Sequence, residues 1–494
     1  MKIQNSRQLT YAWWMYKIPL LVVTFLLSVI STLQSELVVA REQQPDLIAA
    51  RKIARTPTTD RSSTKTPQSA RDYFKRAMQR YRTQDRLGAI ADFDRAIQLQ
   101  PRFVDAYNNR GIVKGSMGDK SGAIADYTVA ISFNPKFFEA YANRGFARLN
   151  MGDRAGAMAD LQAANEIKPN DPQLSIGKGI ILAQSGDKQG AIANYSKAIQ
   201  LRPQSLDAYY NRGLAKLDLG DRQGAIADYN TTIKLKPTYA NAYYGRGKAK
   251  GLTGNYQGAI ADYDLAIALK PNHPNAYFNR AIAKNTIGDR AGAIDDYNRL
   301  VNLNQKDANV YFNRAVVFAE SGDRAKAIAD YTTAVKLNPK LVEAYNNRGI
   351  LLFTIGDLTQ AIADYSEAIR LKPDYALGYL NRGIVFYATS EYKKAVVDYD
   401  RGIALDPSNA ELYFNRGIAQ SRLQDYKQAI ADYNTAIRLQ PNHALAYSNR
   451  GLVHAQLAAN PAATEDLKMA AKLFQAQKNM PAYESVMRKL EQIK

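Results

Sequence analysis

The chain has 494 residues, 46% of them hydrophobic, so it is long enough for several domains or one long array with a buried core. It contains no Cys, which excludes a disulfide framework, a Cys nucleophile, a thiolate metal site and a lipid anchor on an N-terminal Cys. A formal net charge of +20 favours acidic partners, whether nucleic acid, anionic membrane or protein, without choosing among them.

The first forty residues have the pattern of a secretory signal or membrane anchor. Lys2, Arg7 and Lys17 precede an uncharged apolar run over residues 18–35, and short side chains end the segment at Ala40. The run is also long enough to stay as one membrane helix. We therefore expect residues 1–40 to be a cleaved signal peptide or a retained anchor, with the folded part outside the cytoplasm. Positive charge on both sides of the run leaves the opposite orientation open.

Residues 41–69 are rich in Pro, Thr, Ser and basic side chains and carry no apolar period. This composition predicts a flexible, solvated linker.

From Ala70 the sequence repeats every 34 residues. The second Asn of "YNNRG" is Asn109, and the same motif returns in one unit after another. Twelve units fill residues 70–477, and we number positions within a unit from 1, so that Ala70 and Val104 share position 1. Position 20 is Ala in all twelve units, position 8 is Gly or Ala, and position 32 is Pro in ten.

Each unit predicts two helices. The first covers about positions 2 to 14 and usually stops at a Gly followed by Asp, as in Gly118–Asp119. Gly suits the left-handed residue after a helix, and Asp can cap the next one. The second helix covers about positions 17 to 30 and ends before the Pro. One such pair cannot bury its apolar face alone, so neighbouring units must stack.

This pattern resembles the tetratricopeptide repeat (TPR) family; the first full example reads Tyr107, Gly111, Ala123, Tyr127, Ala130 and Pro135. The resemblance covers residues 70–477. It implies an all-α solenoid of twelve 34-residue helix-turn-helix units in a right-handed superhelix, whose first helices line a concave groove. Residues 478–494 resemble the capping helix that closes such arrays.

Position 7 is Arg and position 23 is Asp in eleven units, and both exceptions, Lys178 and Asn194, fall in the fourth unit. This joint departure predicts an ion pair between the two helices, within a unit or across neighbours. The pairs that we select as examples are Arg110 with Asp126, Arg212 with Asp228, and Arg348 with Asp364. Such Arg residues serve the fold and are poor evidence for phosphate binding.

Position 6 is Asn in nine units and is expected to face the groove. In some TPR proteins an Asn at the equivalent place belongs to a ladder that grips a peptide backbone. By that resemblance the peptide-binding residues are Asn109, Asn143, Asn211, Asn279, Asn313, Asn347, Asn381, Asn415 and Asn449. The alternative is that Asn solvates the face or bonds along its own helix. Lys75, Gly177 and Gly245 interrupt the row.

Hydrogen bonds from a few Asn side chains cannot offset the cost of association alone. Position 5 offers apolar help in four consecutive units, as a strip of groove aromatics: Tyr210, Tyr244, Phe278 and Phe312. The alternative for these rings is contact with the preceding unit. A chaperone-type clamp is not predicted, because position 5 never carries Lys.

The sequence predicts no catalytic triad, phosphate loop, metal cluster or cofactor site, and it places His273 and His443 in turns. We therefore expect a non-enzymatic scaffold that binds a protein or peptide, held at a membrane by residues 18–35 if they are not cleaved. The alternative is a solenoid that binds nucleic acid or another acidic partner in the cytoplasm. A basic stripe at position 11 favours that alternative: Lys114, Arg148, Lys216, Lys250 and Lys284.

Overall fold

The computed structural model describes residues 68–304 and 306–493. The predicted signal or anchor and most of the predicted linker lie outside these residues. Within them the chain forms twenty-five α-helices and no strand, so the all-α prediction is confirmed. None of these helices combines the length and the apolar character needed to cross a membrane.

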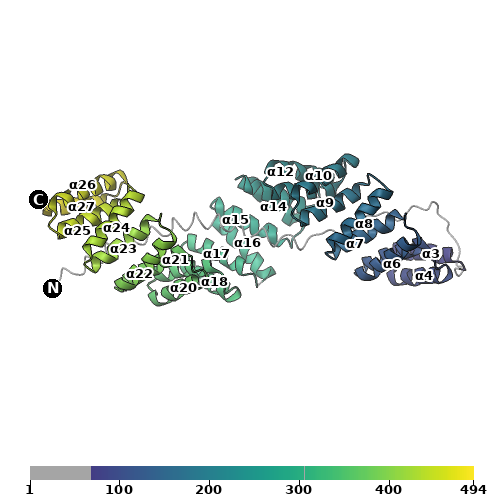
Figure 1. Cartoon of the computed structure of the whole chain (residues 1–494), viewed down its shortest axis with the longest axis horizontal. Helices are drawn as coiled ribbons and strands as arrows, with labels where there is room; N and C mark the ends of the chain where they lie inside the picture. Colours follow the sequence, from purple (N-terminus) through teal and green to yellow (C-terminus); the bar gives the residue numbers. More distant parts are fainter. Residues whose placement is uncertain (1–67, 305, 494) are drawn as a thin grey trace. The chain divides into compact units, whose positions relative to one another are not determined.

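Successive helices pair into hairpins (Figure 1). The described helices divide between two compact bodies, an N-terminal body of residues 68–287 and a C-terminal body of residues 288–493. The N-terminal body contains α3 (Ala70–Arg82), α4 (Arg86–Leu99), α5 (Val104–Ser116), α6 (Lys120–Phe133), α7 (Phe138–Asn150), α8 (Arg154–Ile167), α9 (Pro172–Gln184), α10 (Lys188–Leu201), α11 (Leu206–Asp218), α12 (Arg222–Leu235), α13 (Ala240–Leu252), α14 (Tyr256–Leu269) and α15 (Pro274–Thr286).

The C-terminal body contains α16 (Arg290–Leu303), α17 (Ala308–Glu320), α18 (Arg324–Leu337), α19 (Val342–Thr354), α20 (Leu358–Leu371), α21 (Ala376–Ala388), α22 (Tyr392–Leu405), α23 (Ala410–Arg422), α24 (Tyr426–Leu439), α25 (Ala444–Gln456), α26 (Asn460–Ala476) and α27 (Met480–Ile493). The last of these packs Val486 and Leu490 onto Phe474 of α26, as the predicted capping helix should. The predicted boundaries at residues 40, 69 and 477 remain predictions.

The turn between the two helices of a hairpin is built from position 15 and position 16. Gly118 has φ +93°, and seven further Gly at this position also have positive φ, a conformation that costs Gly least. The next residue caps the second helix: the Asp119 carboxylate accepts a hydrogen bond from the Gly122 amide at 2.8 Å. The Gly–Asp pair therefore ends one helix and starts the next.

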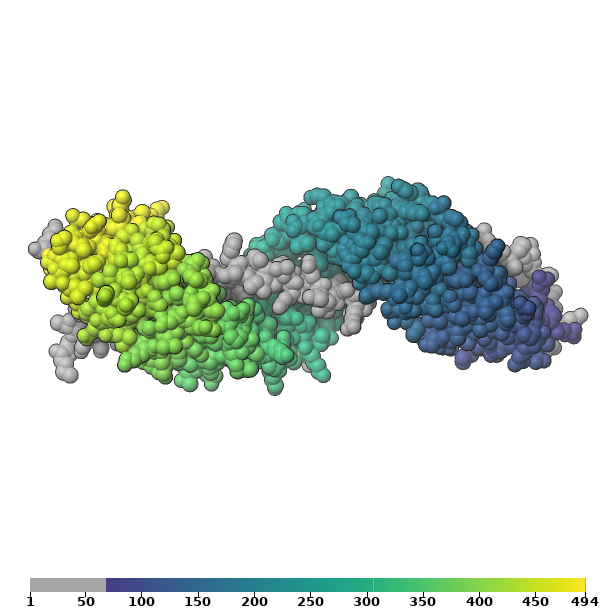
Figure 2. Space-filling view, viewed as in Figure 1, coloured from purple at the N-terminus to yellow at the C-terminus, as the bar shows by residue number. Residues whose placement is uncertain are grey.

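Small residues let the paired helices approach closely. A Cβ added to Gly111 would lie 2.7 Å from the Tyr127 ring, and one added to Gly213 would lie 2.9 Å from the Tyr229 ring. The Ala at position 20 is buried throughout, from Ala89 to Ala463. Side chains fill the spaces that the ribbon drawing leaves between the helices of each body (Figure 2).

First helices of neighbouring hairpins also touch one another within each body, as α5 and α7, α11 and α13, and α21 and α23 do. No pair of second helices is in comparable contact among the described residues. Contacts between successive first helices run from α5 to α15 in the N-terminal body and from α19 to α25 in the C-terminal body. We call the side that the first helices form in each body its first-helix wall.

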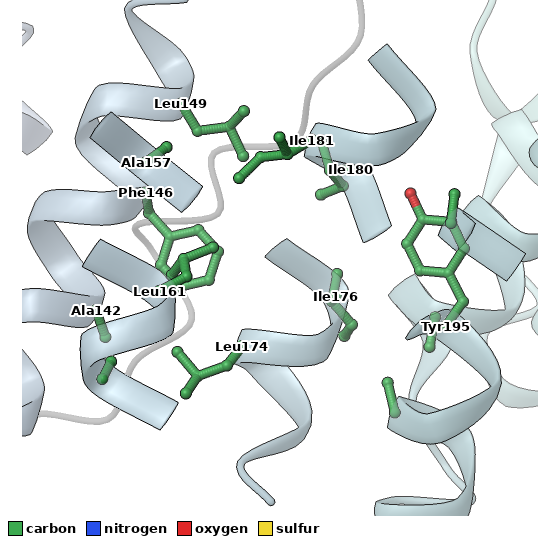
Figure 3. Packing of buried hydrophobic residues seen from close by; sticks show 14 of the residues in the cluster. Ala142, Phe146, Leu149, Ala157, Leu161, Leu174, Ile176, Ile180, Ile181 and Tyr195 are labelled. Atoms are coloured by element: carbon green, nitrogen blue, oxygen red, sulfur yellow. The ribbon is translucent and has the colours of Figure 1, made fainter. Parts of the chain in front are cut away.

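The fourth unit departs from this pattern and packs through an apolar cluster. Phe146, Leu161 and Ile176 are buried between α7, α8 and α9 (Figure 3). A Cβ added to Gly177 would meet Leu161 at 2.7 Å and Phe146 at 2.8 Å. This is why Gly replaces Asn at position 6 of the fourth unit: two apolar side chains occupy the space.

Candidate functional site

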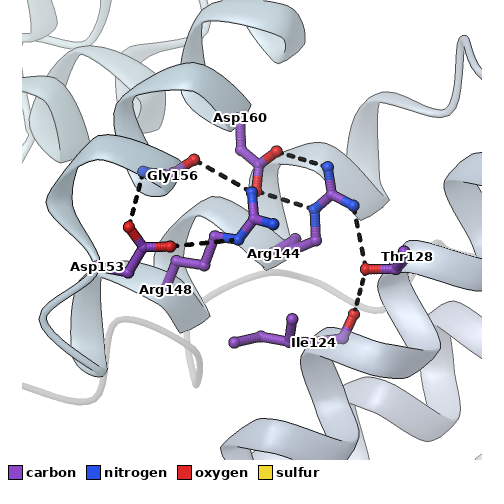
Figure 4. A network of polar contacts seen from close by, with 7 residues as sticks. All are labelled: Ile124, Thr128, Arg144, Arg148, Asp153, Gly156 and Asp160. Carbon is purple, nitrogen blue, oxygen red and sulfur yellow. Dashed lines mark hydrogen bonds and ion pairs between the residues drawn. The ribbon is translucent and has the colours of Figure 1, made fainter.

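The Arg at position 7 joins three helices. In the third unit, Arg144 donates through Nε and Nη2 to the two carboxylate oxygens of Asp160 at 3.0 and 2.7 Å (Figure 4). Its third nitrogen, Nη1, donates to the Thr128 hydroxyl of the preceding unit at 3.1 Å. The guanidinium also lies over the Tyr141 ring, 5.6 Å from its centroid, a cation–π geometry.

The three ion pairs chosen from the sequence are present, each within one unit. Arg110 donates to Asp126 at 2.9 and 2.5 Å, Arg212 to Asp228 at 2.9 and 2.7 Å, and Arg348 to Asp364 at 2.8 and 2.7 Å. The Asp side chains are buried. Hydrogen bonding to Asp228 raises the pKa of Arg212, so the guanidinium keeps its charge.

The sequence analysis missed the partner of the third guanidinium nitrogen. That partner is position 25 of the preceding unit, as in Arg110 with Asp94 at 2.6 Å, Arg246 with Asn230 at 2.8 Å and Arg382 with Ser366 at 3.0 Å. The sequence does contain a pattern that could have predicted this partner: position 25 carries an oxygen acceptor in every unit except the last, which has Lys468. The ion pair lies within a unit, and this second bond links neighbouring units.

The predicted ladder residues adopt two main arrangements. In the first, the Nδ2 amide donates to the carbonyl of position 2 on the same helix at 2.7–2.8 Å; this set contains Asn109, Asn211, Asn313 and Asn415. In the second, the amide reaches position 5 of the preceding unit: Asn143 to Asn108 Oδ1, Asn279 to the Tyr244 hydroxyl and Asn381 to Asn346 Oδ1. All of these residues lie on first helices.

The last two predicted residues differ from both sets. Asn347 is buried, with its Nδ2 3.4 Å from the Tyr331 hydroxyl. Asn449 is half-buried on α25. The expected alternative, bonding along the helix, therefore describes four of the nine Asn residues, and their role in binding remains a prediction.

Family models identify the repeat independently. A TPR-repeat model matches residues 179–220, 317–356, 351–390, 385–424 and 422–457, and two tetratricopeptide-repeat models match residues 210–274 and 138–171. Together these matches cover more than half of the chain. The chain belongs to the tetratricopeptide repeat family.

Solved structures with a related helical architecture include the yeast Tom70 structure, 17% identical over 86% of this chain and 95% of that chain, with a TM-score of 0.35. A TPR protein from Parabacteroides merdae is 22% identical over 50% of this chain and 98% of that chain, with a TM-score of 0.39. YrrB, whose structure is described as a TPR protein with an unusual peptide-binding site, is 21% identical over 37% of this chain and 95% of that chain. Its TM-score is 0.32. No curated protein matches the chain.

The predicted groove aromatics of the TPR array lie mostly inside it. Tyr210, Tyr244 and Phe312 are each less than a tenth exposed. Their rings pack on residues of their own unit, since Tyr210 lies 5.2 Å from Tyr239 and Tyr244 lies 4.9 Å from His273, centroid to centroid. Burial raises the pKa of Tyr244 to about 12. Phe278 is half-buried. Packing therefore accounts for these rings, and a contact with a partner remains a prediction.

The predicted basic stripe is largely engaged inside the TPR units. Lys114 lies 2.9 Å from Asp126, and Lys216 and Lys250 lie 2.9 and 2.8 Å from Asp228 and Asp262. Arg148 likewise lies 2.8 Å from Asp160. In these units one buried carboxylate serves two cations, so position 11 helps to hold the hairpin together.

Both turn histidines cap helices. The Nδ1 atom of His273 accepts a hydrogen bond from the Ala276 amide at 3.3 Å, and His443 accepts one from the Ala446 amide at the same distance. His273 is buried, and burial lowers its pKa to about 4, with help from Lys270. The described residues contain no group of three or more His, Asp or Glu arranged to hold a metal ion.

Proposed function

We propose that the TPR array is a protein-interaction scaffold whose first-helix wall binds an extended segment of a partner protein. Family membership supports the scaffold role. The observations that carry the finer proposal are Asn109 and Asn211 on the first-helix wall of the N-terminal body, and Asn313 and Asn415 on that of the C-terminal body. Each of them uses one amide N–H on its own helix, which leaves Oδ1 and a second N–H that match the donor and acceptor of a peptide unit.

This arrangement also makes a clean test possible. Asn143, Asn279 and Asn381 connect neighbouring units, so replacing them would disturb the fold. The four residues with a bond only to their own helix can be changed with little loss of packing. We therefore choose Asn109→Ala, Asn211→Ala, Asn313→Ala and Asn415→Ala, combined in the full chain. The matched control replaces Gln200, Asn302 and Gln428, exposed amides on second helices, by Ala.

Peptides selected from a phage-displayed library on the full chain serve as the probe. Loss of the two hydrogen bonds that one body offers, at about 0.5–1.5 kcal/mol each, predicts at least roughly fivefold weaker binding to the fourfold Asn variant. The control should bind as the parent does, and circular dichroism should show both variants folded. Equal binding by the Asn variant and the parent would refute the ladder and leave the scaffold role standing.

We also propose that residues 1–40 attach the TPR array to a membrane or direct its export. The support is the basic start followed by the apolar run at residues 18–35. Sequencing the N-terminus of the mature protein, after alkaline extraction of membranes, tests this. A full-length chain found only in the soluble cytoplasmic fraction would refute it.

A further inference from the structure

The first helix of the array carries a row of basic side chains that the other units lack. Arg71, Lys75 and Arg82 occupy positions 2, 6 and 13 of α3, and we call them the α3 basic stripe. Spacings of four and seven residues place them on one side of the helix, and all three side chains are exposed. At positions 2 and 6 the eleven other units have no basic residue, as Asp105 and Asn109 of α5 illustrate. The stripe is therefore a property of the first unit and not of the repeat.

The cations of the α3 basic stripe are not neutralised by their own helix. The one carboxylate of α3 belongs to Asp72, and it is engaged at the N-cap, where it accepts a hydrogen bond from the Ser69 hydroxyl at 2.7 Å. The cations at positions 7 and 11 of this unit, Arg76 and Arg80, both bind the buried Asp92. The stripe forms no such ion pair with any residue that the structure describes, so it presents its positive charge to solvent.

This end of the array also lacks a neighbour. The Nη1 atom of Arg110 donates to Asp94 of the preceding unit, but Nη1 of Arg76 has no acceptor among the described residues. The Arg76 side chain is 36% exposed, compared with 17% for Arg110. Because no hairpin precedes α3 in the described part of the chain, its outer side is open to a partner.

The turn after α3 adds one apolar side chain and another cation. Leu87, in the first turn of α4, is 72% exposed, the highest value among the large hydrophobic residues that the structure describes. Arg86 precedes it and is also exposed, and Arg82 of the stripe lies at the other end of this turn. Basic side chains around an exposed Leu are typical of surfaces that lie on a membrane, where cations contact anionic headgroups and the apolar group enters the boundary below them.

We propose that α3 and the turn after it form a membrane-binding face, in which the α3 basic stripe contacts the anionic headgroups of a lipid bilayer. This rests on the proposal that residues 1–40 attach the array to a membrane, and it adds which unit meets the lipid. The apolar run at residues 18–35 lies upstream of α3, separated from it by residues 36–69. A solvated chain of that length has ends roughly 30 Å apart, so an anchored chain keeps the first unit near the bilayer. Nucleic acid would satisfy the same charges, but it gives no reason for the exposed Leu87.

The chain has no Cys, so a single Cys introduced at Gln79 can carry an environment-sensitive fluorophore. Gln79 is exposed on α3, between Lys75 and Arg82 of the stripe. The full chain with Gln79→Cys is mixed with phosphatidylcholine vesicles, alone or with about 30% phosphatidylglycerol as the anionic lipid. We expect a blue shift only with phosphatidylglycerol, and its loss at about 0.5 M NaCl, because salt at that strength screens the attraction. A label at Gln189→Cys, exposed on α10, should not respond.

The stripe variant combines Arg71→Gln, Lys75→Gln and Arg82→Gln in the labelled chain, since Gln has a helix propensity close to that of the basic residues. Near an anionic surface each cation strengthens binding about fivefold, so the blue shift with phosphatidylglycerol should fall at least fivefold. The matched control replaces three exposed cations elsewhere by Gln: Lys136, Arg222 and Lys427. It removes the same charge and should leave the shift unchanged, and circular dichroism should show both variants folded.

Three results would overturn the proposal. They are no shift with phosphatidylglycerol, a shift of the same size in the stripe variant and the parent, and a larger shift with single-stranded DNA in the absence of vesicles, which would assign the stripe to nucleic acid. Sedimentation with phosphatidylcholine vesicles at about 0.5 M NaCl tests residues 1–40 separately, since an inserted apolar run resists salt. A chain that sediments in this way without a lipid-dependent shift keeps its anchor and refutes the membrane-binding face; a shift without such sedimentation supports the face and refutes the anchor.

Discussion

At the scale of single residues, the Tyr and Arg of the repeated motif pack and hold the fold, and the Asn between them lies on the surface of the first helix. The Arg stacks on the Tyr, binds the buried Asp of its own unit and reaches the preceding unit, as Arg212 does with Tyr209, Asp228 and Ser196. A bidentate Arg–carboxylate pair fixes geometry, which Lys cannot do in the same way. The Asn beside it donates to its own helix, as Asn211 does, or to position 5 of the preceding unit, as Asn143 does.

Sequence reasoning could predict the Arg–Asp pair because both exceptions occur in one unit. It could not predict which bond each Asn makes, since that depends on the facing residue. Where position 5 of the preceding unit offers an oxygen, as Asn108 and Tyr244 do, the following Asn reaches it. Where position 5 is apolar, as in front of Asn211 and Asn415, the amide turns to its own helix.

A pH-dependent local stability is predicted at His273. The buried ring is neutral in the folded chain, with a pKa of about 4. Unfolded His has a pKa near 6.5, so protons bind the unfolded form more strongly between these values. The contribution of His273 is therefore complete above about pH 6.5 and is lost progressively as the pH falls towards 4.

Hydrogen exchange of residues 274–286, corrected for intrinsic rates, should show weaker protection at pH 5 than at pH 7.5. His273→Asn keeps a capping side chain that does not titrate, so its protection should not depend on pH in this range. Equal pH dependence in the parent and the variant would show that another group is responsible.

At the scale of the helix pair, the spacing of small residues sets how closely the two helices approach. The sequence predicted this pairing because Gly or Ala recurs at position 8 of every unit, and an aromatic ring recurs at position 24 of all units except the third and twelfth, which have Leu161 and Leu467. The sequence analysis did not predict that the cation of position 11 is supplied from position 19 in some units. In the eighth and tenth units Phe318 and Phe386 occupy position 11, and lysines at position 19, Lys326 and Lys394, lie over these rings. Position 11 therefore contributes to the hairpin in one of two ways: as a second cation on the buried carboxylate, or as an aromatic ring under a lysine.

Two glycines of α13 predict opposite effects of the same substitution. A Cβ on Gly247 would lie 2.8 Å from the Tyr263 ring and 3.2 Å from the Ala259 carbonyl, so Gly247→Ala forces a shift. A Cβ on Gly251 would have only ordinary contacts at 3.8 Å, so Gly251→Ala gains helix propensity. We expect Gly251→Ala to stabilise the hairpin by about 0.5–1 kcal/mol. Gly247→Ala should destabilise it by about 1 kcal/mol or more, because the overpacking outweighs the same gain.

Hydrogen-exchange protection of α13 and α14 measures both effects, and each variant is the control for the other. A stabilising Gly247→Ala would mean that Tyr263 moves away at little cost. Ala occupies the same position natively in other units, as Ala281 and Ala315.

At the scale of the whole molecule, a single 34-residue period generates both bodies. Stability in such an array is close to a sum of unit and interface terms, so the fold tolerates one irregular unit. The fourth unit is irregular in this sense: it lacks the Arg–Asp ion pair and packs through the apolar cluster around Leu161 and Phe146 instead. The sequence could show that this unit was exceptional. It could not predict the compensating cluster, because that cluster depends on how side chains from three helices pack together.

The central claim is that the Arg row holds the array together while the first-helix wall meets the partner. Photo-crosslinking of a selected peptide to the full chain, followed by mass spectrometry, tests it most directly. We predict crosslinks confined to first helices and recurring at intervals of about 34 residues, as a peptide following consecutive units requires. Crosslinks concentrated on second helices, or on the turns alone, would contradict the claim.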